Sequence, residues 1–204
     1  MKHVNNIIRF VLFITLLVFP SKVFPQKDYE KGYIITNNKD TLVGLVKDRK
    51  QPPFGKLYKK VYFKKKHRKK KYGPDQILGY KQGKREFESL WINVSSHLYN
   101  EKYTSIQNSG EKEFLKVVVK GYLTYYQREF ADPESDYIDQ ISLFKREDEN
   151  YLVRVTQGIF GLKKKNLAVY FNDCSELVKR IESGELKDPI TIVNFYNSWK
   201  IDHH

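Results

Sequence analysis

The stretch YIITNNKDTLVGLV at residues 33–46 decides the fold, because it joins two strand-forming runs through a polar turn. Residues 33–36 and 41–46 are rich in β-branched, aromatic and aliphatic side chains, which are favoured in strands. Residues 37–40 are Asn-Asn-Lys-Asp, and Asn and Asp side chains hydrogen-bond their own backbone in turns. The stretch therefore predicts an antiparallel hairpin with a four-residue loop.

Seven more strand-forming runs follow this hairpin. They cover residues 61–63, 77–80, 87–94, 114–119, 122–130, 137–144 and 151–155. Lys120-Gly121 suits a tight turn between two of these runs, and the acidic residues 146–150 suit a turn between the last pair. QPPFG at residues 51–55 breaks the pattern after the first hairpin. A series of antiparallel hairpins is thus expected as far as residue 155.

The hydrophobic period changes after residue 160. Apolar residues then recur at i, i+3, i+4 and i+7 in two sets, Cys174, Leu177, Val178 and Ile181, and Ile192, Phe195, Tyr196 and Trp199. This spacing places each set on one face of an α-helix. Residues 161–171 predict a further helix.

Residues at the predicted helix ends support these assignments. Asp173 and Glu176 have the spacing of a capping pair, and Gly184 lies where a C-terminal cap belongs. Asp188 followed by Pro189 fits an N-cap and the first position of the last helix. Strands first and helices last predict an α+β fold: antiparallel β-hairpins forming a sheet or partial barrel, followed by two to three C-terminal helices.

Residues 1–25 predict a secretory signal peptide. Lys2 and Arg9 give a positive start, residues 10–19 are apolar apart from Thr15, and Pro20 ends the run. A bilayer span needs about 20 apolar residues, so this run is too short, and no longer one follows. The residues before Gln26 suit cleavage poorly, which leaves retention as an uncleaved anchor as an alternative. Residues 26–204 are expected to form a single exported domain.

The charge is concentrated in one segment of this domain. The chain has a net charge of +13, of which Lys2, Arg9 and Lys22 in the leader contribute three. Residues 56–71 hold ten Lys or Arg and no acid, so the rest of residues 26–204 is neutral overall. We therefore expect a basic patch that binds anions, formed by Lys59, Lys60, Lys64, Lys65, Lys66, Arg68, Lys69, Lys70 and Lys71. The alternative is a solvated hairpin tip in a lysine-rich protein.

Two motifs resemble a family of exported, uncharacterised Bacteroidetes proteins. One is the GYIIT-x3-DT-x2-G hairpin at residues 32–44, and the other is the DC-x2-L helix start at residues 173–177. The resemblance covers most of residues 26–204. It implies a location in the cell envelope or outside the cell, and it brings no known activity and no catalytic residues.

No catalytic motif or metal-ligand pattern is found in the sequence. Cys174 is the single cysteine, so no intrachain disulfide can form, and its place on an apolar helix face predicts a buried core thiol rather than a nucleophile. DPESD at residues 132–136 lacks the glycine and the closing Glu of a calcium loop. The sequence thus predicts no enzyme, no cofactor and no metal.

The sequence predicts an exported cell-envelope protein of unknown activity, periplasmic, outer-membrane-associated or secreted. It would act as a binding or structural module whose basic patch contacts anionic lipid headgroups or glycans, or another envelope protein. Nucleic acid is not expected as a partner, because an exported protein does not normally meet it. The alternatives are a protein-interaction module with no electrostatic ligand, using the aromatic strand at residues 122–130, and an enzyme of undetected type.

Overall fold

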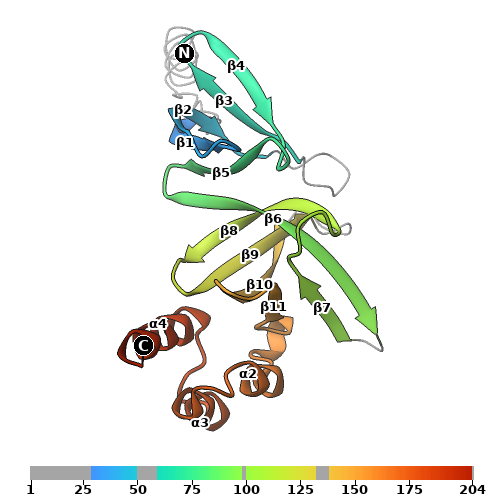
Figure 1. Ribbon diagram of the computed structural model, residues 1–204, viewed down its shortest axis with the longest axis vertical. Helices are drawn as coiled ribbons and strands as arrows, with labels where there is room; N and C mark the ends of the chain where they lie inside the picture. The colour runs from blue at the N-terminus through green and yellow to red at the C-terminus, as the bar shows by residue number, and fades with distance from the viewer. Residues whose placement is uncertain (1–28, 50–58, 98–99, 132–137, 204) are drawn as a thin grey trace, which may run out of the picture.

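A computed structural model describes residues 29–49, 59–97, 100–131 and 138–203, and they have the predicted α+β architecture (Figure 1). Eleven antiparallel strands come first and three α-helices last. The strands are β1 (Glu30–Thr36), β2 (Thr41–Lys47), β3 (Val61–Lys65), β4 (Arg68–Tyr72), β5 (Ile77–Gln82), β6 (Arg85–His97), β7 (Asn100–Thr104), β8 (Glu111–Val119), β9 (Leu123–Ala131), β10 (Ile138–Arg146) and β11 (Tyr151–Arg154). The helices are the 3-10 turn η1 (Gly158–Phe160), α2 (Lys164–Tyr170), α3 (Ser175–Ser183) and α4 (Pro189–Asp202).

The first hairpin is confirmed and lies inside an N-terminal sheet with the order β4-β3-β2-β1-β5-β6. β1 and β2 pair from Glu30↔Val46 to Ile35↔Thr41. Gly32 lets β1 approach β5 closely on its other side, since a Cβ atom there would lie 1.8 Å from the Lys81 carbonyl oxygen of β5. Two strands were not predicted, β4 and β7. Residues 66–72, expected as part of a connection, instead turn back and pair with β3.

A closed barrel of six strands follows, because β6 pairs with β7 and also with β8. Its strand order is β6-β7-β11-β10-β9-β8. Each of the six strands contributes one side chain to a single buried cluster: Ile92, Tyr103, Leu115, Tyr126, Leu143 and Leu152. These side chains are at most 5% exposed, so the barrel is a filled core, as expected for so small a barrel. β6 belongs to both the N-terminal sheet and the barrel and joins them.

The three helices cover the outside of the barrel at the end away from the β3–β4 hairpin (Figure 1). Tyr125, Phe144 and Val153 alternate with the inward-facing residues of their strands and pack against Leu177, Ile192 and Tyr196 of the helices, among others. The cap predictions at Gly184, which is left-handed with φ 79°, and at Asp188, which accepts from the Thr191 amide at 2.9 Å, are confirmed.

The predicted capping pair at Asp173 and Glu176 is wrong. Cys174 is the N-cap of α3 and makes no capping hydrogen bond with its side chain. Asp173 instead accepts from Arg146 at 2.7 Å and from the Tyr196 hydroxyl at 2.6 Å. The ion pair with Arg146, which is distant in sequence, therefore replaces the local capping bond that the spacing predicted.

Arg146 at the end of β10 connects the barrel to α2, to α4 and to the turn before α3. Its Nη2 donates to Asp173 and to the Tyr170 carbonyl, each at 2.7 Å, and its guanidinium lies 4.7 Å from the Tyr170 ring centroid and 5.1 Å from that of Tyr196. Nη1 pairs with Glu149 at 2.9 Å. Burial and the hydrogen bond to Asp173 raise the pKa of Tyr196, so this hydroxyl stays protonated in the cluster.

Arg49, which follows β2, connects the N-terminal sheet to the barrel. Its side chain is 6% exposed, and its Nη2 pairs at 2.7 Å with Glu129 of β9, a carboxylate that is 13% exposed. Asp48 completes this network, since it accepts from Arg49 at 3.3 Å, from Arg85 at 3.0 Å and from the Tyr80 hydroxyl. The guanidinium also lies 5.0 Å from the centroid of the buried Phe87 ring.

Some sequence predictions fall outside the described residues: the leader at residues 1–25, the break at 51–55 and the acidic segment at 132–136. Within the described ranges, no helix combines the length and the apolar character needed to cross a bilayer.

Candidate anion-binding site

Seven of the nine predicted anion-binding residues lie on one hairpin, formed by β3, β4 and the turn at Lys66 and His67. Val61 and Phe63 of β3 are at most 5% exposed and fix the hairpin to the core of the N-terminal sheet. β4 is the outermost strand in the sheet order, and the hairpin lies at the end of the molecule opposite the helices (Figure 1). We call this element, with Lys64, Lys65, Lys66, Arg68, Lys69, Lys70 and Lys71, the basic hairpin.

Cations of the basic hairpin face each other across the two strands. The register places Lys64 opposite Lys69 and Lys65 opposite Arg68. Like charges directly opposite destabilise a strand pair, so this arrangement opposes folding. Among the described residues, no carboxylate lies within ion-pair distance of any of the seven cations.

Aromatic rings accompany three of these lysines. The Lys70 ammonium lies 4.9 Å from the Tyr72 ring centroid, and that of Lys71 lies 5.0 Å from Tyr62. Lys69 approaches the Tyr29 ring at 6.0 Å. Such cation–π contacts stabilise an exposed cation by about 0.5–1 kcal/mol, which offsets part of the like-charge repulsion without neutralising the charge.

Lys59 and Lys60, the other two predicted residues, immediately precede β3. Lys59 pairs with Glu111 of β8 at 2.6 Å, and this hydrogen bond lowers the pKa of Glu111. Both lysines line a groove of about 530 Å³ at the base of the basic hairpin. Asp75, Gln76 and Trp91 also line this groove. No sequence pattern predicted them, because the turn before β5 and the strand β6 are separate segments of the chain.

The turn of the basic hairpin carries backbone strain. Lys66 has φ 53°, in the left-handed region where glycine is favoured over other residues. We predict that Lys66→Gly raises the free energy of unfolding by about 0.5–1 kcal/mol, because it relieves this strain and removes a like charge. Urea denaturation of the two proteins measures the difference. A loss of stability would show that the Lys66 side chain makes a stabilising contact.

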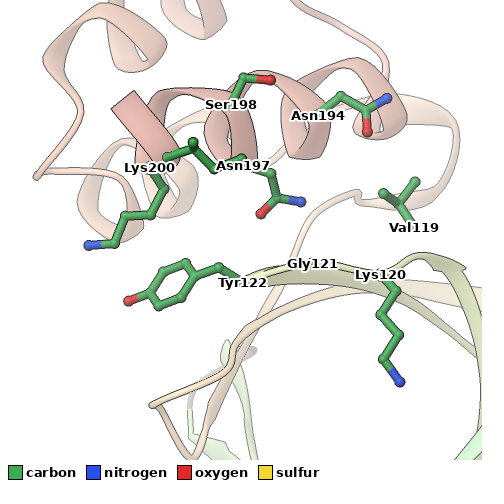
Figure 2. A pocket seen from close by; sticks show the side chains of 9 residues that line it. Val119, Lys120, Gly121, Tyr122, Asn194, Asn197, Ser198 and Lys200 are labelled. Carbon is green, nitrogen blue, oxygen red and sulfur yellow. The ribbon is translucent and has the colours of Figure 1, made fainter. Parts of the chain in front are cut away.

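A second cavity, of about 600 Å³, lies between α4 and the turn joining β8 to β9 (Figure 2). Asn197 points from the helix toward Gly121, accepts from the Leu123 amide at 2.8 Å and donates to the Leu123 carbonyl at 3.0 Å. Lys120 points away from the helix and pairs with Glu88 at 2.6 Å. Asn197 thus holds α4 against the barrel and Lys120 is paired with β6, so this cavity is a weaker candidate for a ligand.

Cys174, the single cysteine, lies in the core. Cys174 is 1% exposed and burial raises the pKa of its thiol, as a core position predicts. Within the described ranges, no group of three or more His, Cys, Asp or Glu side chains could hold a metal ion. Tyr125 and Tyr126 of β9 are each 5% exposed and belong to the core, whereas Phe130 at the end of the strand is 36% exposed.

Comparison of the chain with protein-family models, with curated proteins and with solved structures finds no match.

Proposed function

We propose that this protein is an exported cell-envelope module that binds an anionic envelope component through the basic hairpin. The observation that carries the proposal is the pairing of Lys64 with Lys69 and of Lys65 with Arg68, with no carboxylate near them in the described chain. Such a hairpin is less stable than one with mixed charges, and a polyanion would relieve the repulsion on binding. The signal peptide predicted at residues 1–25 would place it among anionic lipid headgroups and glycans.

The position of the basic hairpin supports this role. It lies at one end of the long axis of the molecule, so a large surface or polymer can reach it without meeting the barrel or the helices (Figure 1). Its cations are exposed apart from Lys64, which is half-buried, and exposed charges act over about 8 Å at physiological salt. Binding should therefore be reversible and sensitive to salt.

We predict that replacing Lys64, Lys65, Arg68 and Lys69 together by Gln abolishes retention on anionic vesicles and on an acidic polysaccharide resin. Each Lys or Arg near an anionic surface contributes about 1 kcal/mol, so the four substitutions weaken binding by roughly two to three orders of magnitude. Co-sedimentation and resin retention at 0.05–0.5 M salt measure this, and 0.5 M salt should release the wild-type protein.

The control is a triple variant of exposed lysines at the helical end, Lys165, Lys179 and Lys187, each changed to Gln. This variant should keep wild-type retention, which distinguishes the basic hairpin from general positive charge. Thermal unfolding should show the fourfold variant to be at least as stable as the wild type, because the like-charge pairs are gone. Retention that changes neither with salt nor with the fourfold substitution would refute the proposal.

A further inference from the structure

We propose that the ligand is an acidic glycan, bound by the groove at the base of the basic hairpin with Trp91 as its stacking platform. This rests on the proposed function and narrows it, because it chooses a glycan over a lipid headgroup. We call this groove of about 530 Å³ the Trp91 groove; it is lined by Lys59, Lys60, Gly73, Pro74, Asp75, Gln76, Trp91, Gly110, Glu111 and Lys112.

Trp91 is half-buried on the outer face of β6 and opens onto this groove. Its cross-strand partner is Lys112 of β8. An indole offers a large apolar face, and the apolar C–H face of a sugar ring can lie flat against it. The neighbouring Lys112 would place an ammonium beside the ring that stacks there. A lipid headgroup has no such face to present to Trp91.

The Trp91 groove contains both donors and acceptors. Lys60 and Lys112 donate only, whereas the carboxylates of Asp75 and Glu111 accept only. The Gln76 side-chain oxygen accepts from the Gly73 amide at 2.9 Å, which leaves its amide nitrogen to donate. A sugar hydroxyl both donates and accepts, so it matches this mixture. An ionised phosphodiester only accepts, so it would leave the two carboxylates without a donor.

The charge of the groove also favours a ligand of low charge density. Its three lysines, Lys59, Lys60 and Lys112, face two acids, Asp75 and Glu111, which leaves a net charge of +1. Lys59 and Glu111 already neutralise each other at 2.6 Å. A sugar acid with one carboxylate and several hydroxyls fits this balance, because its hydroxyls can bond to the donors and acceptors that remain.

The rim of the Trp91 groove is preorganised. Ser89 of β6 donates its hydroxyl to the Pro74 carbonyl at 2.6 Å, and Asn37 donates to the Asp75 carbonyl at 2.9 Å. The bond from the Gly73 amide to Gln76 closes the same turn. These three hydrogen bonds hold the turn at residues 73–76, which includes Asp75 and Gln76. A rigid site loses less entropy when it binds a ligand.

The Trp91 groove and the basic hairpin together form an extended site. The groove includes Gly73 at the end of β4, and the hairpin turn begins at Lys66, seven residues away. At about 3.3 Å per strand residue the two ends are roughly 23 Å apart. A polymer that spans them would bind much more tightly than a short oligomer, because the second contact becomes intramolecular.

The test uses Trp199→Phe protein, in which Trp91 is the sole tryptophan of the chain. Oligogalacturonates of two to twelve units are titrated while Trp91 fluorescence is followed, with neutral malto-oligosaccharides, phosphatidylglycerol vesicles and single-stranded oligo-dT as separate probes. We expect oligogalacturonate to change the fluorescence, with affinity rising with length. Trp91→Ala, assayed by calorimetry, should weaken that binding about tenfold or more and leave vesicle binding unchanged. Phe160→Ala, at a side chain that is 78% exposed on η1, is the control and should bind as the parent does.

The outcomes separate this inference from the proposed function. If the fourfold hairpin variant loses binding but Trp91→Ala does not, the inference is overturned and the proposed function stands. The inference is also overturned if vesicles or oligo-dT bind more tightly than every oligogalacturonate. If none of the anionic probes binds, both proposals are overturned together.

Discussion

Replacing Arg49 by Met is expected to lower the free energy of unfolding by about 3–5 kcal/mol, the largest effect of any single substitution proposed for this protein. The substitution removes the cation that pairs with Glu129, a carboxylate only 13% exposed, and it removes one of the two cations that pair with Asp48 among the described residues. Removing one partner of a buried ion pair costs more than the pair contributes, because the remaining charge has been taken out of water. Equilibrium urea denaturation followed by circular dichroism measures the loss.

A double-mutant cycle with Glu129 tests the cause of this loss. Glu129→Gln in the Arg49→Met background should recover part of the stability, because the unpaired charge is gone. Arg180→Met is the matched control: its side chain is 38% exposed and pairs with Glu176 within one helix. That exposed pair should contribute no more than about 0.5 kcal/mol. A loss at Arg49 no larger than at Arg180 would show that the network does not hold the N-terminal sheet to the barrel.

Replacing Arg146 is expected to release the helical layer from the barrel. Arg146→Ala should lower the free energy of unfolding by about 3 kcal/mol, since it removes the bonds to Asp173 and to the Tyr170 carbonyl together with the stacking on two rings. The carboxylates of Asp173 and Glu149 are 34% and 35% exposed, so water can compensate part of the loss and the effect stays below that at Arg49.

Arg146→Lys tests whether the positive charge of Arg146 or its planar guanidinium group stabilises the packing of the helices on the barrel. A lysine keeps the positive charge, but it cannot stack as a planar group or bond to Asp173, Glu149 and Tyr170 at once. We expect it to recover less than half of the stability lost in Arg146→Ala, as measured by urea denaturation. Full recovery would show that charge alone attaches α2, α3 and α4 to the barrel.

The elements that were predicted correctly from the sequence are those whose structure depends on residues close to one another along the chain. The hairpin at residues 33–46, the cap at Gly184 and the N-cap at Asp188 are confirmed because turn and cap chemistry acts over four or five residues. β4 was missed because its sequence, RKKKY, has no hydrophobic alternation. Its pairing depends on β3, which is anchored by Val61 and Phe63.

The candidate site was predictable only in part, for the same reason. A run of lysines is visible in the sequence, so the basic hairpin could be named residue by residue. The cross-strand opposition of Lys64 and Lys69 depends on register, which a one-residue shift would change. The Trp91 groove joins the turn after β4 to β6 and β8, and closure of the barrel brings these strands together. No single stretch of sequence contains that information.

The outermost position of β4 has a consequence for self-association. A terminal strand has backbone N–H and C=O groups that a second copy could pair with, which is a common route to aggregates. On β4, Arg68, Lys69, Lys70 and Lys71 come in succession, so two copies that approach edge to edge repel each other. The charges that would attract a polyanion therefore also oppose edge-to-edge pairing of two copies, and a polyanion that neutralises them would remove this repulsion.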